Sequence, residues 1–134
     1  MTSTVVLSDG SPRTAELERS LAAAGAGPVR HLDWRRPVGA PIAAIQPQLI
    51  FIDEPACSPL PLAVIREARS SAPRATVVVR AAWPDANWLV DAQLSGASAV
   101  LPSQLADDRL AATVGELLHT PVPEPQSTAL RWAA

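Results

Sequence analysis

The sequence predicts a three-layer α/β fold in which a parallel sheet lies between helices. First, short β-rich runs alternate along the chain with segments of helical spacing, as in βαβ units. Second, the runs at 49–53 and 75–81 are apolar at nearly every position, which is typical of strands buried on both faces. Third, 134 residues with 48% hydrophobic content suffice for one core. These observations favour a single domain of the α/β class.

The chain opens with a predicted strand at 4–8 and a helix at 11–25. Ser11 suits the N-cap of this helix and Pro12 its first helical position, because proline lacks the N–H that would stay unpaired there. Gly25 is placed to end the helix.

Two weaker elements follow. A strand at 28–32 is predicted at an edge of the sheet, because it has polar residues and begins at Pro28. Pro37 and Pro41 allow only a short helix near 41–46. The remaining predicted elements are a strand at 49–53, a helix at 60–72, a strand at 75–81, a helix at 84–96, a strand at 98–102 and a helix at 104–119.

Five such units suit a flavodoxin-like fold, a five-stranded parallel sheet of order 2-1-3-4-5 with helices on both faces. Residues 1–119 form this domain, and 120–134, with three prolines near its start, is predicted to be an extended arm or linker. Functional sites of this fold form at the carboxyl ends of the strands. The polar side chains and segments predicted there are Ser8, Asp9, Asp53, Arg80 and 102–103.

Composition excludes several classes of function. A net charge of -2 gives no electrostatic footprint for nucleic acid. The sequence shows neither a signal peptide nor an apolar run of about 20 residues, so we expect a cytoplasmic domain with no membrane partner. One cysteine, Cys57, excludes an internal disulfide framework. All 11 basic residues are arginines and tyrosine is absent, which excludes mechanisms that need a lysine ammonium or a tyrosine hydroxyl.

Four segments resemble the receiver domain of bacterial two-component response regulators, over roughly 4–118. VVLSDGSP resembles the strand that ends in an acidic pair, and QPQLIFID the strand that ends in the phosphoacceptor aspartate. ATVVVRAA resembles the strand that ends in a switch threonine or serine, and GASAVLPSQ the segment that carries a conserved lysine. The resemblance implies a receiver fold.

In that family, a carboxylate accepts the phosphoryl group while acidic side chains hold Mg²⁺. The resemblance places Asp53 at the phosphoacceptor position and Asp9 at one position of the acidic pair, with Ser8 replacing the other. Asp53 and Asp9 are therefore predicted to form a residual acidic pocket that binds Mg²⁺ weakly at most. The open alternative for Asp53 is a structural carboxylate that accepts N–H bonds from a loop.

Three further positions depart from the family pattern. Arg80 stands where the switch hydroxyl is expected, Ser103 at the lysine position and Val100 at that of a mobile aromatic residue. We therefore interpret the chain as a degenerate receiver, or pseudo-receiver, with no catalytic residue and no cofactor. The Arg80 guanidinium could form a bidentate pair with Asp53, which would hold one conformation, or it could face solvent.

The tryptophans predict a surface for partners. Trp83 and Trp88 flank the start of the helix at 84–96, a region that receiver domains use for partners and dimers, and Trp132 lies beyond the prolines. Tryptophan is enriched at interface hot spots. For Trp83 and Trp88 the alternative is that one or both cover the sheet edge or fill the core. For Trp132 three placements stay open: on its own domain, on a partner subunit, or at the start of a linker to an output module.

We expect a non-enzymatic signalling domain that acts through a protein partner or a homodimer, like the pseudo-receivers at the N-termini of transcription or antitermination regulators. One alternative is a functional receiver phosphorylated on Asp53 with Mg²⁺. The other is a small-molecule-binding regulatory domain, although the GAG at 25–27 follows a helix instead of preceding one, unlike a phosphate-binding loop.

Overall fold

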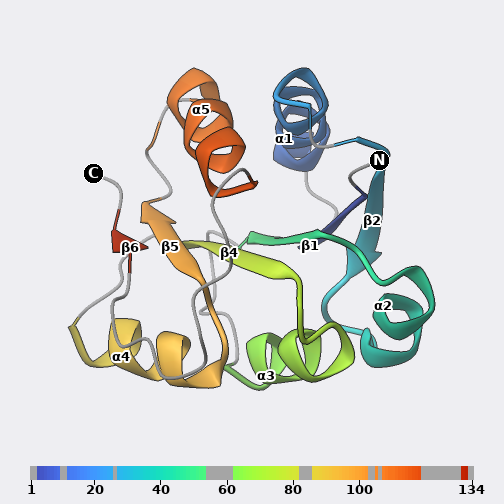
Figure 1. Cartoon of the computed structure of the whole chain (residues 1–134), viewed down its shortest axis with the longest axis vertical. Helices are drawn as coiled ribbons and strands as arrows, with labels where there is room; N and C mark the ends of the chain where they lie inside the picture. The colour runs from blue at the N-terminus through green and yellow to red at the C-terminus, as the bar shows by residue number, and fades with distance from the viewer. Residues whose placement is uncertain are drawn as a thin grey trace.

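A computed structural model describes residues 3–9, 12–25, 27–53, 62–81, 86–102, 105, 107–118 and 131–132. A central sheet carries α1 and α5 on one face and α2, α3 and α4 on the other (Figure 1). The strands are β1 (Thr4–Ser8), β2 (Val29–Asp33), β3 (Leu49–Asp53), β4 (Thr76–Ala81), β5 (Ala99–Pro102) and β6 (Arg131–Trp132). The helices are α1 (Pro12–Ala23), α2 (Gly39–Ile45), α3 (Leu62–Ser71), α4 (Ala86–Ser95) and α5 (Asp107–Leu118).

The strand order is β2-β1-β3-β4-β5-β6, and every neighbouring pair is parallel. The first five strands confirm the predicted order 2-1-3-4-5. Each predicted helix and strand is present, with ends within three residues of those expected. No helix in the described part of the chain is long and apolar enough to cross a bilayer.

β6 is the element that the sequence did not predict. Residues 131–132 lie in the segment predicted as an arm, but they pair with Ala99 and Val100 and so extend the sheet. A strand of two residues is too short to give a periodic signal, which is why the hydrophobic pattern does not reveal it.

The core forms one layer on each face of the sheet. Along β3, Ile50 and Ile52 pack on the side of α2, α3 and α4, while Leu49 and Phe51 pack on the side of α1 and α5. All four side chains are fully buried. This alternation explains why a strand buried on both faces reads as an uninterrupted apolar run.

Arg69 and Gly96 lie at the edge of the sheet where the strands begin, opposite the predicted site. There they join α3 to the start of β4 and the end of α4. The Arg69 guanidinium donates to the carbonyls of Gly96 (Nη2–O 2.8 Å) and Ala75 (Nη1–O 2.7 Å). Gly96 has a φ of +124°, and a Cβ there would lie 2.6 Å from Arg69 Cβ. Only glycine combines this backbone angle with this close approach, so Gly96, the last residue of the helix predicted at 84–96, is required for packing.

Candidate functional site

The site lies where β3 and β4 end, on the sheet face that carries α1 and α5. Asp53 and Arg80 are direct register partners on these strands. Register partners on neighbouring parallel strands point to the same face of the sheet. The residues two positions earlier, Phe51 and Val78, belong to the core layer under α1 and α5, which identifies that face.

Arg80 and Asp53 form a buried bidentate ion pair. Arg80 Nε donates to Asp53 Oδ1 at 2.8 Å, and Arg80 Nη2 donates to Oδ2 at 3.0 Å. Only 6% of Asp53 and 2% of Arg80 are exposed to solvent. Of the two orientations considered for Arg80, the solvent-facing one is wrong.

The Phe51 ring packs against the guanidinium of Arg80. Arg80 Cζ lies 5.9 Å from the ring centroid, within the range of a cation–π contact. Moving a charge out of water costs several kcal/mol, and here both the carboxylate and the ring offset that cost. The arginine is therefore a core residue of this sheet and not a side chain at its rim.

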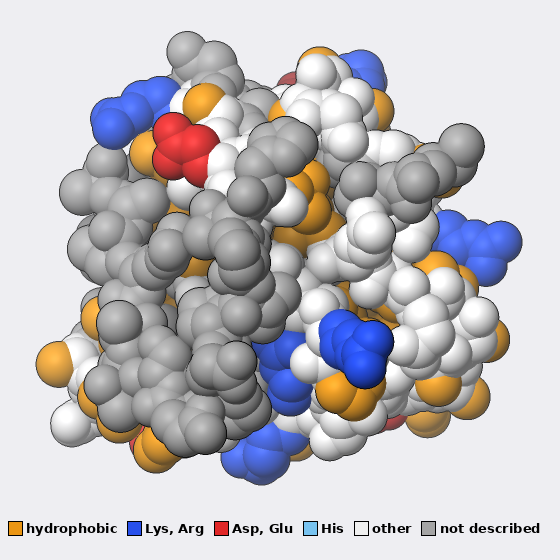
Figure 2. Space-filling model, viewed as in Figure 1, with side chains coloured by type: hydrophobic (Ala, Val, Ile, Leu, Met, Phe, Trp, Pro, Cys, Tyr) orange, Lys and Arg blue, Asp and Glu red, His pale blue; other side chains and the backbone are white. Residues whose placement is uncertain are grey.

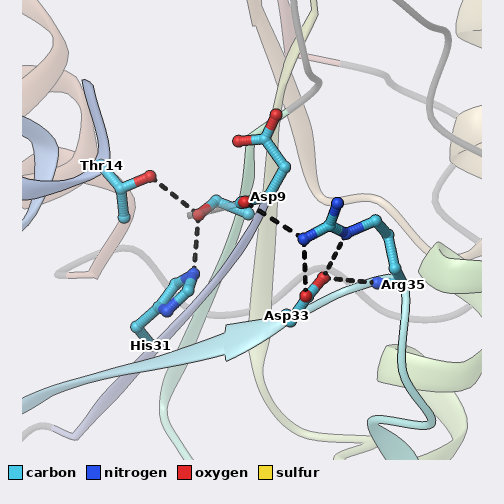
Figure 3. A network of polar contacts seen from close by, with 6 residues as sticks. Asp9, Thr14, His31, Asp33 and Arg35 are labelled. Carbon is cyan, nitrogen blue, oxygen red and sulfur yellow. Dashed lines mark hydrogen bonds and ion pairs between the residues drawn. The ribbon is translucent and has the colours of Figure 1, made fainter. Parts of the chain in front are cut away.

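Ser8, at the position of the second acidic residue, belongs to a cluster of polar side chains. Its Oγ lies 2.8 Å from Thr14 Oγ1 on α1 and 2.8 Å from His31 Nε2 on β2 (Figure 3). A serine beside an imidazole can act as an activated nucleophile. Ser8 is only 1% exposed, so its hydroxyl connects β1, α1 and β2 but does not meet a substrate.

Asp9 lies beside a second arginine. Arg35 Nη2 donates to the Asp9 carbonyl at 3.4 Å, while Arg35 Nε and Nη2 donate to Asp33 Oδ1 and Oδ2 at 3.0 and 2.9 Å (Figure 3). The backbone N–H of Arg35 also donates to Asp33 Oδ1 at 2.9 Å. Hydrogen bonding to Arg35 lowers the pKa of Asp33 from its usual 3.8 to about 2.

The described residues do not fit a Mg²⁺ site. Among them, no group of three or more His, Cys, Asp or Glu side chains could hold a metal ion. Both Asp53 oxygens accept hydrogen bonds from a guanidinium. The cation beside Asp53 in this structure is therefore an arginine of the chain itself.

Other predicted site residues are distributed differently. Val100 is fully buried in the core. Trp88 is half-buried and packs against the core layer of α2, α3 and α4, as in the alternative weighed for it. Trp132 lies in β6. Ser103 and Trp83 lie outside the described residues.

The sequence did not predict the contacts of His31 and Asp33. The separation of two residues between Asp33 and Arg35 was an available signal, because a short Asp side chain often bonds to backbone two residues on. The contacts of Ser8 with Thr14 and His31 join separate elements, and no local pattern encodes them.

No protein-family model and no curated protein matches the sequence. The fold is nevertheless found in solved structures. A pilus assembly-related protein of Burkholderia pseudomallei has a TM-score of 0.70 at 20% identity, covering 92% of this chain and 95% of that one. The signal receiver domain of the response regulator NarL from Mycobacterium tuberculosis has a TM-score of 0.71 at 18% identity, covering 87% and 95%.

A pilus assembly protein (CpaE) of Burkholderia thailandensis is also similar, with a TM-score of 0.64 at 23% identity and coverage of 87% and 97%. The chain has the receiver fold of response regulators. At these identities the likeness concerns the fold, and the side chains at the carboxyl edge of the sheet must provide the argument about function.

Proposed function

We propose that this chain is an atypical receiver, or pseudo-receiver, a non-enzymatic signalling domain that acts through protein contacts largely without phosphorylation of Asp53. The observation that carries the proposal is the buried bidentate pair between Arg80 and Asp53. The fold supports a role in signalling, and this pair opposes the chemistry by which receivers are switched.

The first argument concerns the nucleophile. To attack phosphorus, a carboxylate oxygen must meet the phosphoryl group in line with the leaving oxygen. Each oxygen of Asp53 accepts a hydrogen bond from Arg80, and only 6% of the residue is exposed. Attack would therefore require the ion pair to open first, which leaves two buried charges without their partner.

The second argument concerns the cations that assist transfer. A Mg²⁺ ion and a lysine normally offset the charge of the phosphoryl group. The chain contains no lysine, and the side chain beside Asp53 at the end of β4 is the guanidinium of Arg80. This guanidinium pairs with the acceptor itself and so lowers its nucleophilicity.

The third argument concerns the response. A receiver changes shape when a hydroxyl near the end of this strand bonds to the new phosphate. Arg80 replaces that hydroxyl, and its side chain is already fixed between Asp53 and Phe51. A protein held in one conformation acts by presenting a constant surface, so we propose a protein partner or a second copy as its target.

Acetyl phosphate provides the test. The wild-type chain, incubated with acetyl phosphate and Mg²⁺, is expected to show no phosphoryl adduct by intact mass, whereas a receiver with the complete acidic pocket becomes labelled. The control is Asp53→Asn. A stable adduct on the wild-type chain that is absent from this variant would establish the phosphoacceptor alternative.

A further inference from the structure

The outer edge of β5 already binds an extended segment. Ala99 and Val100 pair in parallel with Arg131 and Trp132 of β6. The edge of a sheet presents unpaired N–H and C=O groups that can template another strand. The chain's own β6 demonstrates that this edge has the geometry to accept one.

The pairing of β6 is weak compared with that of the inner strands. It spans two register pairs, while β1 and β2 share five. Each backbone hydrogen bond contributes only about 1 kcal/mol net. Joining residues 131–132 to the sheet also brings together parts of the chain that are far apart in sequence, which costs entropy. A competing strand could therefore displace β6.

The helix beside this edge exposes apolar side chains. Val90 is 54% exposed and Leu94 80%, and they lie one helical turn apart on α4. Figure 1 places α4 next to β5 and β6, and hydrophobic side chains reach the surface in the same region of Figure 2. A strand seated on β5 would direct alternate side chains toward this side of the sheet.

We infer that the outer edge of β5 is a strand-binding site, which the chain closes on itself with residues 131–132 and which opens to an extended segment of a protein partner. The partner segment adds parallel to β5 and carries an apolar side chain on the side of α4. The inference rests on the proposed function, since it specifies the surface through which a domain that acts by protein contacts, and not by phosphorylation of Asp53, meets its partner.

A peptide that repeats the chain's own segment tests the site. Trp132→Pro in the full chain removes one N–H and disfavours β6, because proline cannot complete a ladder. A fluorescein-labelled peptide of residues 127–134 is then added, and its anisotropy is measured. We expect this variant to bind the peptide about tenfold or more tightly than the wild-type chain, in which the tethered segment competes at high effective concentration.

Two controls localise the binding. A peptide with proline at the positions of Arg131 and Trp132 should not bind. Hydrogen exchange should show that the amides of 99–101 lose protection in Trp132→Pro and regain it with the peptide. In the wild-type chain, excess peptide should speed exchange at 131–132 by displacing β6, and this measurement needs no variant.

Equal binding to both chains, equal binding of the proline peptide, or unchanged exchange at 99–101 would overturn the inference. Concentration-dependent dimerisation of Trp132→Pro without peptide binding would overturn it too, because the outer edge of β5 would then bind a second copy of the chain. No phosphodonor or Mg²⁺ enters these measurements. Their failure is therefore distinguishable from phosphorylation of Asp53, which would refute the proposed function.

Discussion

Asp53 and Arg80 are register partners at the ends of neighbouring parallel strands, and their side chains close on each other as a bidentate ion pair at 2.8 and 3.0 Å. The receiver fold usually keeps this edge of the sheet open for a cation and a phosphoryl group. Here the cation is covalently part of the chain. The stability of the chain and the reactivity of Asp53 therefore depend on the same ion pair, and both can be measured.

Arg80→Ala should destabilise the chain strongly. The substitution leaves the Asp53 carboxylate buried without its partner, and breaking one side of such a pair costs about 3–5 kcal/mol. The measurement is the free energy of unfolding from urea titration at pH 7. Arg74→Ala, at an exposed arginine just before β4, is the matched control and should change that free energy by less than about 0.5 kcal/mol. Similar losses in both variants would show that the pair does not stabilise the fold.

Asp33 provides a pH-dependent prediction. Because Arg35 lowers the pKa of Asp33 from 3.8 to about 2, the folded chain binds this proton less readily than the unfolded chain. The resulting stabilisation is fully present above about pH 4 and disappears as the pH falls through about 2. Carboxyl NMR should give a midpoint near 2 for Asp33.

Variants of Arg35 and Arg36 separate the effect of hydrogen bonds on the pKa of Asp33 from the effect of nearby positive charge. Arg35→Ala removes the hydrogen bonds and should return the pKa of Asp33 toward 3.8, while Arg36→Ala removes only a weaker charge effect. An equal rise in both variants would mean that general positive charge, and not the hydrogen bonds of Arg35, lowers the pKa.

Two glycines allow a matched test of packing. Gly96→Ala should cost more than 1 kcal/mol, because φ is +124° and the new Cβ would lie 2.6 Å from Arg69 Cβ. Gly115→Ala, within α5 and with open space around it, should stabilise by up to about 1 kcal/mol through helix propensity. Thermal unfolding of both variants checks the sign. A tolerated alanine at 96 would show that α3 and α4 can separate at no cost.

The sequence was informative where the structure repeats a local pattern. The apolar runs of β3 and β4 predicted strands buried on both faces, because the period of a hydrophobic pattern and burial are linked. The pairing of Arg80 with Asp53 could be stated only as one of two orientations. Deciding between them requires the register of two strands, which no local pattern encodes.

The contacts of Ser8 could not be predicted from the sequence either. Its neutral side chain predicted a weakened metal site, but its two partners come from α1 and β2 and are set by the packing of three elements. β6 likewise depends on where the chain returns after α5. Long-range contacts of single residues leave little trace in composition or periodicity.

Restoring the missing chemical groups is the strongest test of the proposal that Arg80 keeps Asp53 from accepting a phosphoryl group. The combined variant Ser8→Asp, Arg80→Thr and Ser103→Lys supplies the second acidic residue, the hydroxyl and the lysine, and removes the competing guanidinium. We expect Mg²⁺-dependent labelling of Asp53 by acetyl phosphate in this variant, measured by intact mass, and its loss when Asp53→Asn is added. Ser8→Asp alone should remain unlabelled, because Arg80 still occupies both carboxylate oxygens. Labelling of Ser8→Asp alone would show that the ion pair opens readily, and that the missing acidic residue, not Arg80, had prevented the reaction.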